Sequence, residues 1–314
     1  VLINLLNLID GANKRKMNSL ILSIDFKKAF DSIDHRFINS CLTLLNFGDS
    51  FKKWVQVFFQ NRETYLLLDG HMGEKIVLEQ GVPQGDILSP YIFNIAVEFL
   101  LMKISHTDTI EGVKLPGWEY RAQTYADDTT IFIKRTEANL RNLVKIIRDF
   151  SKISGLQANL DKTSVTPIGG IHSINKEDQL CPELGLKWVT SFTLLGITFD
   201  SKLEHLQANF EEKILKTQSL IEKWKRRKLT MRGRIGITKC LLLSNFIYLL
   251  TILDTEKTGI IEKLQNLLDD FIRGDTRKHW CSAELLYSDK PKGGMSFFDL
   301  KTFVKGLKLA WMRR

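Results

Sequence analysis

Two adjacent carboxylates lie at the tip of a predicted β-hairpin. Tyr125 and Ala126 lead into Asp127 and Asp128, and the apolar run of residues 129–133 follows as a second strand. Like charges side by side repel, so a chain that places two acids between strands commonly needs a divalent cation with oxygen ligands there. The structural alternative is an ordinary turn, because an Asp side chain bonds its own backbone and tolerates turn geometry.

A third acid ends another predicted strand. Residues 20–24 have the apolar pattern of a buried strand, Asp25 follows them, and Phe26 to Phe30 begin a helical pattern. Asp25 together with Asp127 and Asp128 forms a candidate carboxylate set for two metal ions. Such a set holds the attacking and leaving oxygens of an in-line phosphoryl transfer.

These motifs resemble those of the reverse transcriptases. Residues 125–128 match the YxDD box of that family, and Asp25 matches the acid of its first palm motif. Residues 23–35 are similar to the LINE-type, non-LTR retrotransposon form, in which the phrase D-F-x-K-A-F-D recurs. The resemblance implies RNA-directed DNA synthesis and an α+β, right-hand polymerase fold. Its parts would be an antiparallel palm sheet with packed helices, partial fingers and a helical thumb.

The resemblance also implies roles for single residues of the first motif. Asp25, Asp127 and Asp128 would hold two Mg²⁺ ions, for which Mn²⁺ can substitute, and the backbone carbonyl of Phe26 would be an extra ligand. Phe30 would stand under the sugar of the incoming nucleotide, exclude a 2′-hydroxyl and so select deoxynucleotides. The alternative for Phe30 is a core phenylalanine at helical spacing from Phe26.

Residues 80–90 resemble the second palm motif, whose loop and helix bind the template and the incoming nucleotide. Gln84 and Gly85 are the candidate nucleotide-contacting residues of this loop. Ser89 is predicted to cap the helix that Pro90 begins. Asp86 departs from the family, which more often has a small or sulfur residue there. The alternative is a glycine-rich loop before a core helix.

Two further segments extend the resemblance. Residues 155–163 are similar to a family segment that places a lysine near the pyrophosphate leaving group, which makes Lys162 a candidate general acid. An exposed surface lysine is the alternative. Residues 192–199 look like the primer-grip hairpin, in which Leu195 and Gly196 would meet the primer end.

The charge of the chain suits a polyanionic partner. Lys and Arg number 45 against 36 Asp and Glu, a net charge of +9. Residues 221–239 concentrate this excess, with eight basic residues and one acid. The stretch resembles the LINE-type thumb, and a solvated helix face is the alternative. The residues expected to contact the nucleic-acid backbone are Lys225, Arg226, Arg227, Arg232, Arg234 and Lys239.

We predict three segments: partial fingers and palm over residues 1–200, a basic helical thumb over 201–274, and a post-thumb segment over 275–314. The expected partners are an RNA template, a DNA primer and dNTPs, with no membrane. A longer parent polyprotein is expected to supply the upstream fingers and an endonuclease domain. The four cysteines show no CxxC pairing and predict buried thiols in a reducing, intracellular compartment. The resemblance implies action in the nucleus.

Two alternatives remain open. One is a catalytically decayed or repurposed nucleic-acid-binding protein. The three retained acids argue against it, because an unused acidic cluster repels a polyanion. The other is an RNA polymerase or an intron-encoded reverse transcriptase. Phe30 and the Tyr125-Ala126 pair favour DNA synthesis, and the wording of residues 27–31 favours the LINE type.

Overall fold

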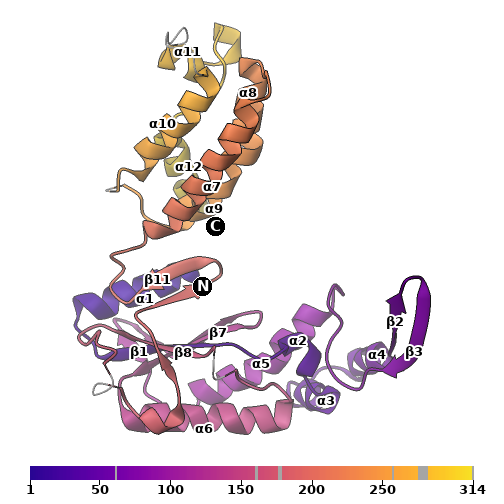
Figure 1. The fold of residues 1–314 in the computed structure, drawn as a ribbon. Helices are drawn as coiled ribbons and strands as arrows, with labels where there is room; N and C mark the ends of the chain where they lie inside the picture. Colours follow the sequence, from indigo (N-terminus) through magenta and orange to yellow (C-terminus); the bar gives the residue numbers. More distant parts are fainter. Residues whose placement is uncertain (61, 160–161, 176–178, 257, 275–281, 313–314) are drawn as a thin grey trace. The chain divides into compact units, whose positions relative to one another are not determined.

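The computed structural model describes residues 1–60, 62–159, 162–175, 179–256, 258–274 and 282–312. The chain divides into two compact units. The first contains Val1–Leu195 and Phe199–Leu203, and the second contains Gly196–Thr198 and Glu204–Arg314. Figure 1 shows the elements of both units.

A five-stranded sheet is the centre of the first unit. Its order is β6-β7-β1-β8-β9, and every pair is antiparallel except β8 with β9, which is parallel. The strands in this order are β6 (Ala122–Tyr125), β7 (Asp128–Lys134), β1 (Ser19–Ile24), β8 (Ser164–Ile168) and β9 (Lys187–Trp188). The strand β1 is therefore central, and the chain leaves it at Asp25.

Helices cover both faces of this sheet (Figure 1). Leu20, Leu22 and Ile24 alternate along β1 and join one core with α5 (Ser89–Ser105) and α6 (Glu137–Ser154). On the other face lies α1 (Leu2–Lys14), which contacts β8. The bounds of α6 follow from its ends: the Thr136 side chain accepts from the Asn139 amide, and Gly155 ends the helix at φ 79°.

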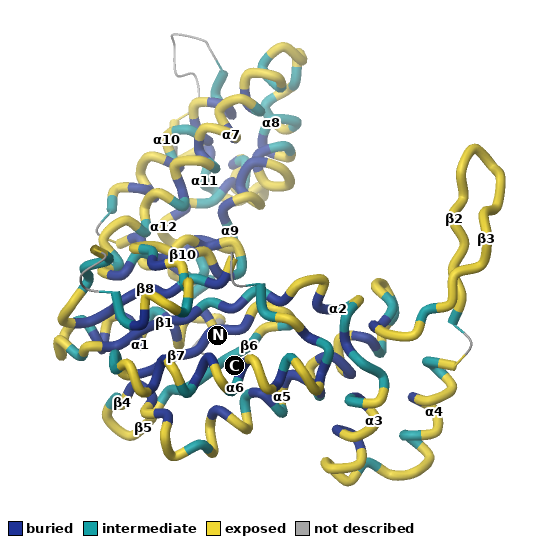
Figure 2. The backbone as a smooth tube through the Cα atoms, turned by 60° about the horizontal axis from the view of Figure 1, so that its bottom comes forward, coloured by how far each residue is buried: buried dark blue, intermediate teal, exposed yellow. Residues whose placement is uncertain are grey.

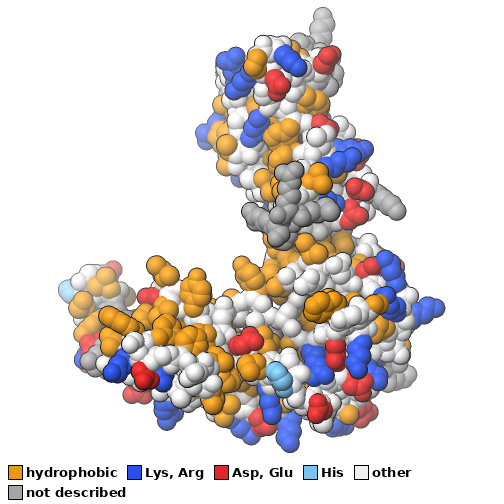
Figure 3. Space-filling model, turned by 180° about the vertical axis from the view of Figure 1, so that it is seen from behind, with side chains coloured by type: hydrophobic (Ala, Val, Ile, Leu, Met, Phe, Trp, Pro, Cys, Tyr) orange, Lys and Arg blue, Asp and Glu red, His pale blue; other side chains and the backbone are white. Residues whose placement is uncertain are grey.

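Short elements complete the first unit. They are α2 (Ala29–Ser32), α3 (His35–Leu44), α4 (Asp49–Phe59), β4 (Val113–Leu115), β5 (Trp118–Tyr120), the 3₁₀ turn η2 (Pro182–Leu184) and β10 (Ser191–Leu194). The hairpin of β2 (Glu63–Leu68) and β3 (His71–Val77) extends away from the sheet, and all its strand residues are exposed (Figure 2). Hydrophobic side chains gather over this part of the unit (Figure 3).

The second unit is helical. Its elements are α7 (Ala208–Lys225), α8 (Met231–Ile237), the π-helical turn η3 (Thr238–Leu242), α9 (Ser244–Ile252), α10 (Ile260–Arg273), α11 (Ala283–Tyr287), the 3₁₀ turn η4 (Lys290–Lys292) and α12 (Leu300–Met312). The strand β11 (Ile197–Asp200) pairs with β10. Among the described residues no single helix is long and apolar enough to span a membrane. One bent pair, Met231–Leu242 with Ser244–Ile252, meets that test by length and composition alone.

Polar contacts fasten the end of the chain to the helices before it. The buried carboxylate of Asp269 on α10 accepts from the Tyr287 hydroxyl at 2.6 Å, and the Gln265 side chain accepts from the Leu300 amide at 2.6 Å. Lys239 donates to the Ser296 carbonyl at 2.8 Å. The described part of the predicted post-thumb segment thus packs within the same unit as the predicted thumb helices.

Two local expectations differ from the structure. Ser89 is the first residue of α5 rather than its cap, and the Asp86 side chain instead accepts from the Leu88 amide at 2.8 Å. Asp86 therefore fixes the turn before the helix. Cys41 and Cys181 are buried as predicted, but Cys240 is exposed because it lies on the outer side of η3. Cys281 lies outside the described residues.

Candidate active site

Antiparallel pairing brings the carboxylates of the first and third motifs together. The register joins Ile24 of β1 to Thr129 of β7, so the next position sets Asp25 opposite Asp128. Asp127 lies in the tight turn just before Asp128. The three acids predicted from separate parts of the chain are therefore neighbours at one end of the sheet.

The turn that carries Asp127 is held by its own strand. Ala126 adopts a left-handed backbone at φ 54°, which costs about 1 kcal/mol in a residue with a Cβ. The Thr124 hydroxyl bonds the Ala126 carbonyl at 3.0 Å and the Asp128 carbonyl at 3.3 Å. Thr124 was not among the predicted site residues. Its contacts fix the turn against this strain.

The acids repel one another in the folded protein. The pKa of Asp128 is raised above its ordinary value of 3.8, mainly by partial loss of hydration, then by the charges of Asp127 and Asp25. Although the residue is exposed overall, nearby protein atoms displace part of the water around its carboxylate. Two like charges opposite each other across strands are destabilising. A cation that binds here would relieve this repulsion.

Asp25 is positioned by a residue that sequence reasoning did not single out. The Asn159 amide donates to the Asp25 carbonyl at 2.7 Å, and its side chain donates to the Asp25 carboxylate at 3.3 Å. Asn159 belongs to residues 155–163, the segment whose family resemblance made Lys162 a candidate. The same resemblance could have drawn attention to Asn159, but no role was predicted for it. Lys162 is exposed, and its ammonium lies 3.8 Å from the Asp25 carboxylate.

The donor chemistry of the acids fits a hard divalent cation, because all three side chains offer carboxylate oxygens. Within the described ranges, no three His, Cys, Asp or Glu side chains are already arranged as a ligand set. A cation would therefore draw the acids closer than they stand here. Phe26, whose carbonyl was the predicted extra ligand, follows Asp25 directly and pairs with Ala158.

The loop of the second motif packs against the residues that follow Asp25. The Gly81 amide donates to the Ile33 carbonyl at 2.8 Å, and His35 contacts the Gly81 carbonyl at 2.7 Å. The exposed Gln84 donates to the Asp31 carboxylate at 3.3 Å. Gly85 is also exposed, with φ 90° and open space where a Cβ would be. Gln84 and Gly85 thus border the first motif.

Phe30 is half-buried and stacks on Phe93 of α5, with ring centroids 4.6 Å apart. The contact supports the core interpretation of this residue. It also fixes the ring, which a sugar-selecting residue requires. The two predicted roles of Phe30 are therefore compatible.

The predicted primer-grip residues form the turn between β10 and β11. Leu195 has φ 49° and Gly196 has φ 75°, the left-handed pair that a two-residue hairpin turn of this kind requires. Glycine adopts this conformation freely, but leucine is strained in it. The turn therefore keeps a leucine at a position where the backbone alone would favour glycine or asparagine.

The predicted nucleic-acid contacts of the second unit divide into two groups. Arg226, Arg227 and Arg232 are exposed. The guanidinium carbon of Arg227 lies 4.7 Å from the ring centroid of Trp224. The other three have partners inside the unit. Arg234 donates to the Phe271 carbonyl at 3.1 Å, Lys239 bonds Ser296 as described above, and Lys225 pairs with Glu222 at 3.0 Å. The bonds of Arg234 and Lys239 join distant parts of the unit, and the contact of all six residues with nucleic acid stays a prediction.

Residues 3–199 match the family described as reverse transcriptase (RNA-dependent DNA polymerase). The chain belongs to this family, as its motifs predicted. The match contains the end of β1, the β6–β7 hairpin and the loop of the second motif. The three acids thus lie in the part of the chain that defines the family.

Similar curated proteins come from mobile elements. A 149 kDa protein of transposon TX1 from Xenopus laevis is 25% identical over 98% of this chain and 23% of its own length. The Pol polyprotein of the retrotransposable element R2DM from Drosophila melanogaster is 26% identical over 95% of this chain and 28% of its own length. The RNA-directed DNA polymerase of the mobile element jockey from Drosophila funebris is 23% identical, with coverages of 82% and 28%. The prediction of a LINE-type, non-LTR reverse transcriptase is thus confirmed, and the chain spans about a quarter of each relative.

Two solved structures of telomerase from Candida tropicalis share the fold. The apo form has a TM-score of 0.51 and 12% identity, over 88% of this chain and 47% of the telomerase chain. The form in complex with a fragment of telomeric RNA has a TM-score of 0.50 and 13% identity, over 87% and 42%. The predicted α+β polymerase fold is confirmed, and at this identity the likeness concerns the fold alone.

Proposed function

We propose that this chain is the catalytic core of an RNA-directed DNA polymerase that extends a primer 3′-hydroxyl with dNTPs on an RNA template. The observation that carries the proposal is the strand register that brings Asp25 opposite Asp128, next to Asp127, in a chain of the reverse transcriptase family. Nucleotidyl transfer needs neutralisation of phosphate charge near the reacting oxygens. Three carboxylates at one sheet end meet that need by recruiting cations.

Asp25, Asp127 and Asp128 would hold two Mg²⁺ ions, which supply an activated hydroxyl nucleophile and neutralise the triphosphate when bound. Asn159 holds the Asp25 carboxylate in place through its side-chain amide. Lys162 carries the proton that the leaving pyrophosphate would take, and its exposed ammonium is within 4 Å of the site at Asp25. Gln84 and Gly85 border the place of the incoming nucleotide, and Leu195 with Gly196 would meet the primer.

The direct test is extension of a labelled DNA primer on an RNA template with Mg²⁺ and dNTPs, comparing the chain with its Asp127→Asn form. Synthesis by the wild-type chain but not by the Asp127→Asn form supports the proposal. Duplex binding is measured in parallel by fluorescence anisotropy. Equal duplex binding without synthesis in either form would instead favour a decayed or repurposed binding module. Synthesis that survives Asp127→Asn would remove Asp127 from the site.

Phe30→Val is expected to admit ribonucleotides, because it removes the ring that would block a 2′-hydroxyl. The measurement is the ratio of kcat/KM for a dNTP and its matching rNTP. Phe93→Leu is the matched control, since it breaks the same 4.6 Å ring stack from the other side. It should lower stability while leaving sugar discrimination intact. Equal loss of discrimination in both variants would make Phe30 a core residue only.

Joint replacement of Arg226 and Arg227 by Gln should weaken primer–template binding uniformly across sequences, because both side chains are exposed cations. The slope of log Kd against log salt should fall by about 2, the release expected for two phosphate contacts. Lys301→Gln with Lys305→Gln removes the same charge from exposed positions of α12. Equal effects from the two pairs would show a response to net charge rather than to the predicted contacts.

A further inference from the structure

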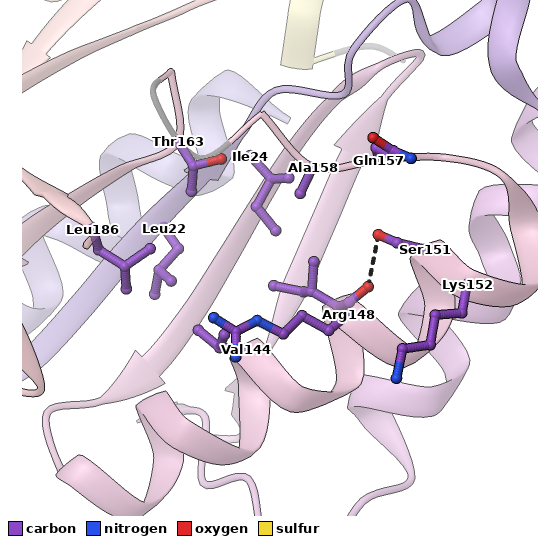
Figure 4. A pocket seen from close by; sticks show the side chains of 11 residues that line it. Leu22, Ile24, Val144, Arg148, Ser151, Lys152, Gln157, Ala158, Thr163 and Leu186 are labelled. Carbon is purple, nitrogen blue, oxygen red and sulfur yellow. Dashed lines mark hydrogen bonds between the residues drawn. The ribbon is translucent and has the colours of Figure 1, made fainter. Parts of the chain in front are cut away.

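An apolar pocket lies between the sheet and α6, and its lining includes Ile24, the last residue of β1 (Figure 4). Its volume is about 320 Å³, at the small end of the range for ligand pockets. Leu22 and Ile24 point into it from β1, and Val144 and Ile147 line it from the helix. Gln157 and Ala158, from the segment after α6, also line it.

The pocket has an apolar interior and two cationic side chains in its lining. Its hydroxyls are already bonded: Ser151 donates to the Ile147 carbonyl at 2.9 Å and Thr163 to the Asn159 carbonyl at 2.8 Å. Arg148 and Lys152 line the pocket, and none of its lining residues is an acid. Lys152 forms an ion pair with Asp149, in which the ammonium nitrogen lies 3.6 Å from a carboxylate oxygen. The Arg148 side chain has no hydrogen bond or ion pair to any residue that the structure describes.

The wall of the pocket is also the support of Asp25. The Lys27 amide donates to the Gln157 carbonyl at 2.8 Å, and the Asn159 amide donates to the Asp25 carbonyl at 2.7 Å. Phe26 pairs with Ala158 between these two bonds. Residues 157–159 therefore form a strap that contacts the pocket on one side and holds the backbone on both sides of Asp25 on the other.

We propose that this pocket binds a small molecule with one negative charge and an apolar body about the size of an aromatic ring system. The bound molecule stabilises the strap that supports Asp25. Burial of the apolar body against Leu22, Ile24 and Ile147 supplies the affinity. The anionic group pairs with Arg148 at the rim, which sets the preference for an anion over a neutral ligand of the same shape. A consequence for catalysis rests on the proposed function, whereas binding does not.

The first test uses 1-anilinonaphthalene-8-sulfonate, an apolar aromatic anion whose fluorescence rises on burial. Saturable binding by the wild-type chain is expected. Arg148→Gln should weaken it about fivefold, the size of one exposed charge pair. Lys145→Gln, the same change on an exposed position of α6 that does not line the pocket, should leave it unchanged. Equal weakening by both changes would overturn the role of Arg148.

Pocket-filling variants test the location. Ser151→Leu places an apolar side chain in the space and should abolish saturable binding. Val144→Met is a second filling variant on the same helix. The dye also has exposed apolar side chains of the β2–β3 hairpin to bind. Unchanged binding in a folded filling variant would therefore overturn the pocket assignment.

Hydrogen exchange tests the coupling to Asp25 without any catalytic readout. The dye should slow exchange of the Lys27 and Asn159 amides in the wild-type chain, because its contact with Gln157 and Ala158 stabilises the strap. The change should be absent in Ser151→Leu. Saturable binding with unaltered exchange at both amides would overturn the coupling, whatever the outcome of the primer-extension assay.

Discussion

Asp128→Asn should abolish primer extension and at the same time stabilise the folded chain. Loss of a carboxylate ligand is expected to lower kcat by about 10³-fold or more, since metal-held charge stabilisation amounts to several kcal/mol. The stability gain should be below about 1 kcal/mol, because the side chain is exposed, so that its carboxylate loses little hydration and solvent screens its repulsion from Asp127 and Asp25. Thermal unfolding and single-turnover extension measure the two effects.

The pH dependence separates the cost of the charged Asp128 carboxylate, which comes from lost hydration and from repulsion, from causes that do not depend on its charge. The raised pKa of Asp128 means that the folded state binds its proton more tightly than the unfolded state. The destabilisation of the wild-type fold by the charged Asp128 carboxylate is therefore complete above that raised pKa. It vanishes as the pH falls below the ordinary value of 3.8. The difference in unfolding free energy between the wild-type chain and Asp128→Asn should shrink over the same fall in pH.

Asp108→Asn is the control for the loss of one exposed acid outside the site. It should leave extension intact and should not reproduce the pH-dependent gain. A stability difference for Asp128→Asn that stays constant as the pH falls from 7 to below 3.8 would contradict a cost that depends on the Asp128 charge. Full extension activity would remove Asp128 from the proposed site.

Gly81→Ala should be one of the most damaging single changes in the first unit. A Cβ at this position would lie 2.7 Å from the Asp31 carbonyl oxygen, and the backbone is left-handed at φ 83°. Conformational strain and forced displacement of backbone together should cost about 2–5 kcal/mol. Because the Gly81 amide and carbonyl also hold Ile33 and His35, the displacement should spread into the segment after Asp25.

Gly85→Ala is the matched comparison in the same loop. Its backbone is also left-handed, at φ 90°, but no heavy atom lies within 4 Å of the added Cβ. Only the conformational term applies, about 1–2 kcal/mol. Urea unfolding at equal m-values should therefore show a clearly larger drop in midpoint for Gly81→Ala. Equal midpoints would mean that the contact with Asp31 yields at little cost.

The catalytic candidates were readable from the sequence because short-range patterns determine them. A buried-strand pattern before Asp25 and a turn pattern at Asp127 and Asp128 place each acid at a strand end. The family order of the motifs then implies that the strands are neighbours. The same local logic accounts for the cap at Thr136 and for the left-handed Gly155 that ends α6. The Ser89 cap failed because Asp86 provides the competing bond one turn earlier.

Local sequence patterns do not predict contacts between residues that lie far apart in the chain. Asn159 lies far along the sequence from Asp25, and its role depends on a strap that forms only when the chain after α6 returns to β1. Which cations of the basic run bond inside the unit also depends on distant partners such as Phe271 and Ser296. Sequence periodicity records which face of a helix is polar, but not which distant carbonyl a cation meets.

The sequence by itself thus determined the family, the acids and the order of the motifs, because these depend on residue type, spacing and local backbone preference. The tertiary structure alone decided that Asp25 stands opposite Asp128, that the chain after residue 281 packs onto α10, and that a pocket adjoins the strap of Asp25. Strand register and packing join residues that are not neighbours in the sequence. Such contacts follow from the collective burial of the core, which no local pattern specifies.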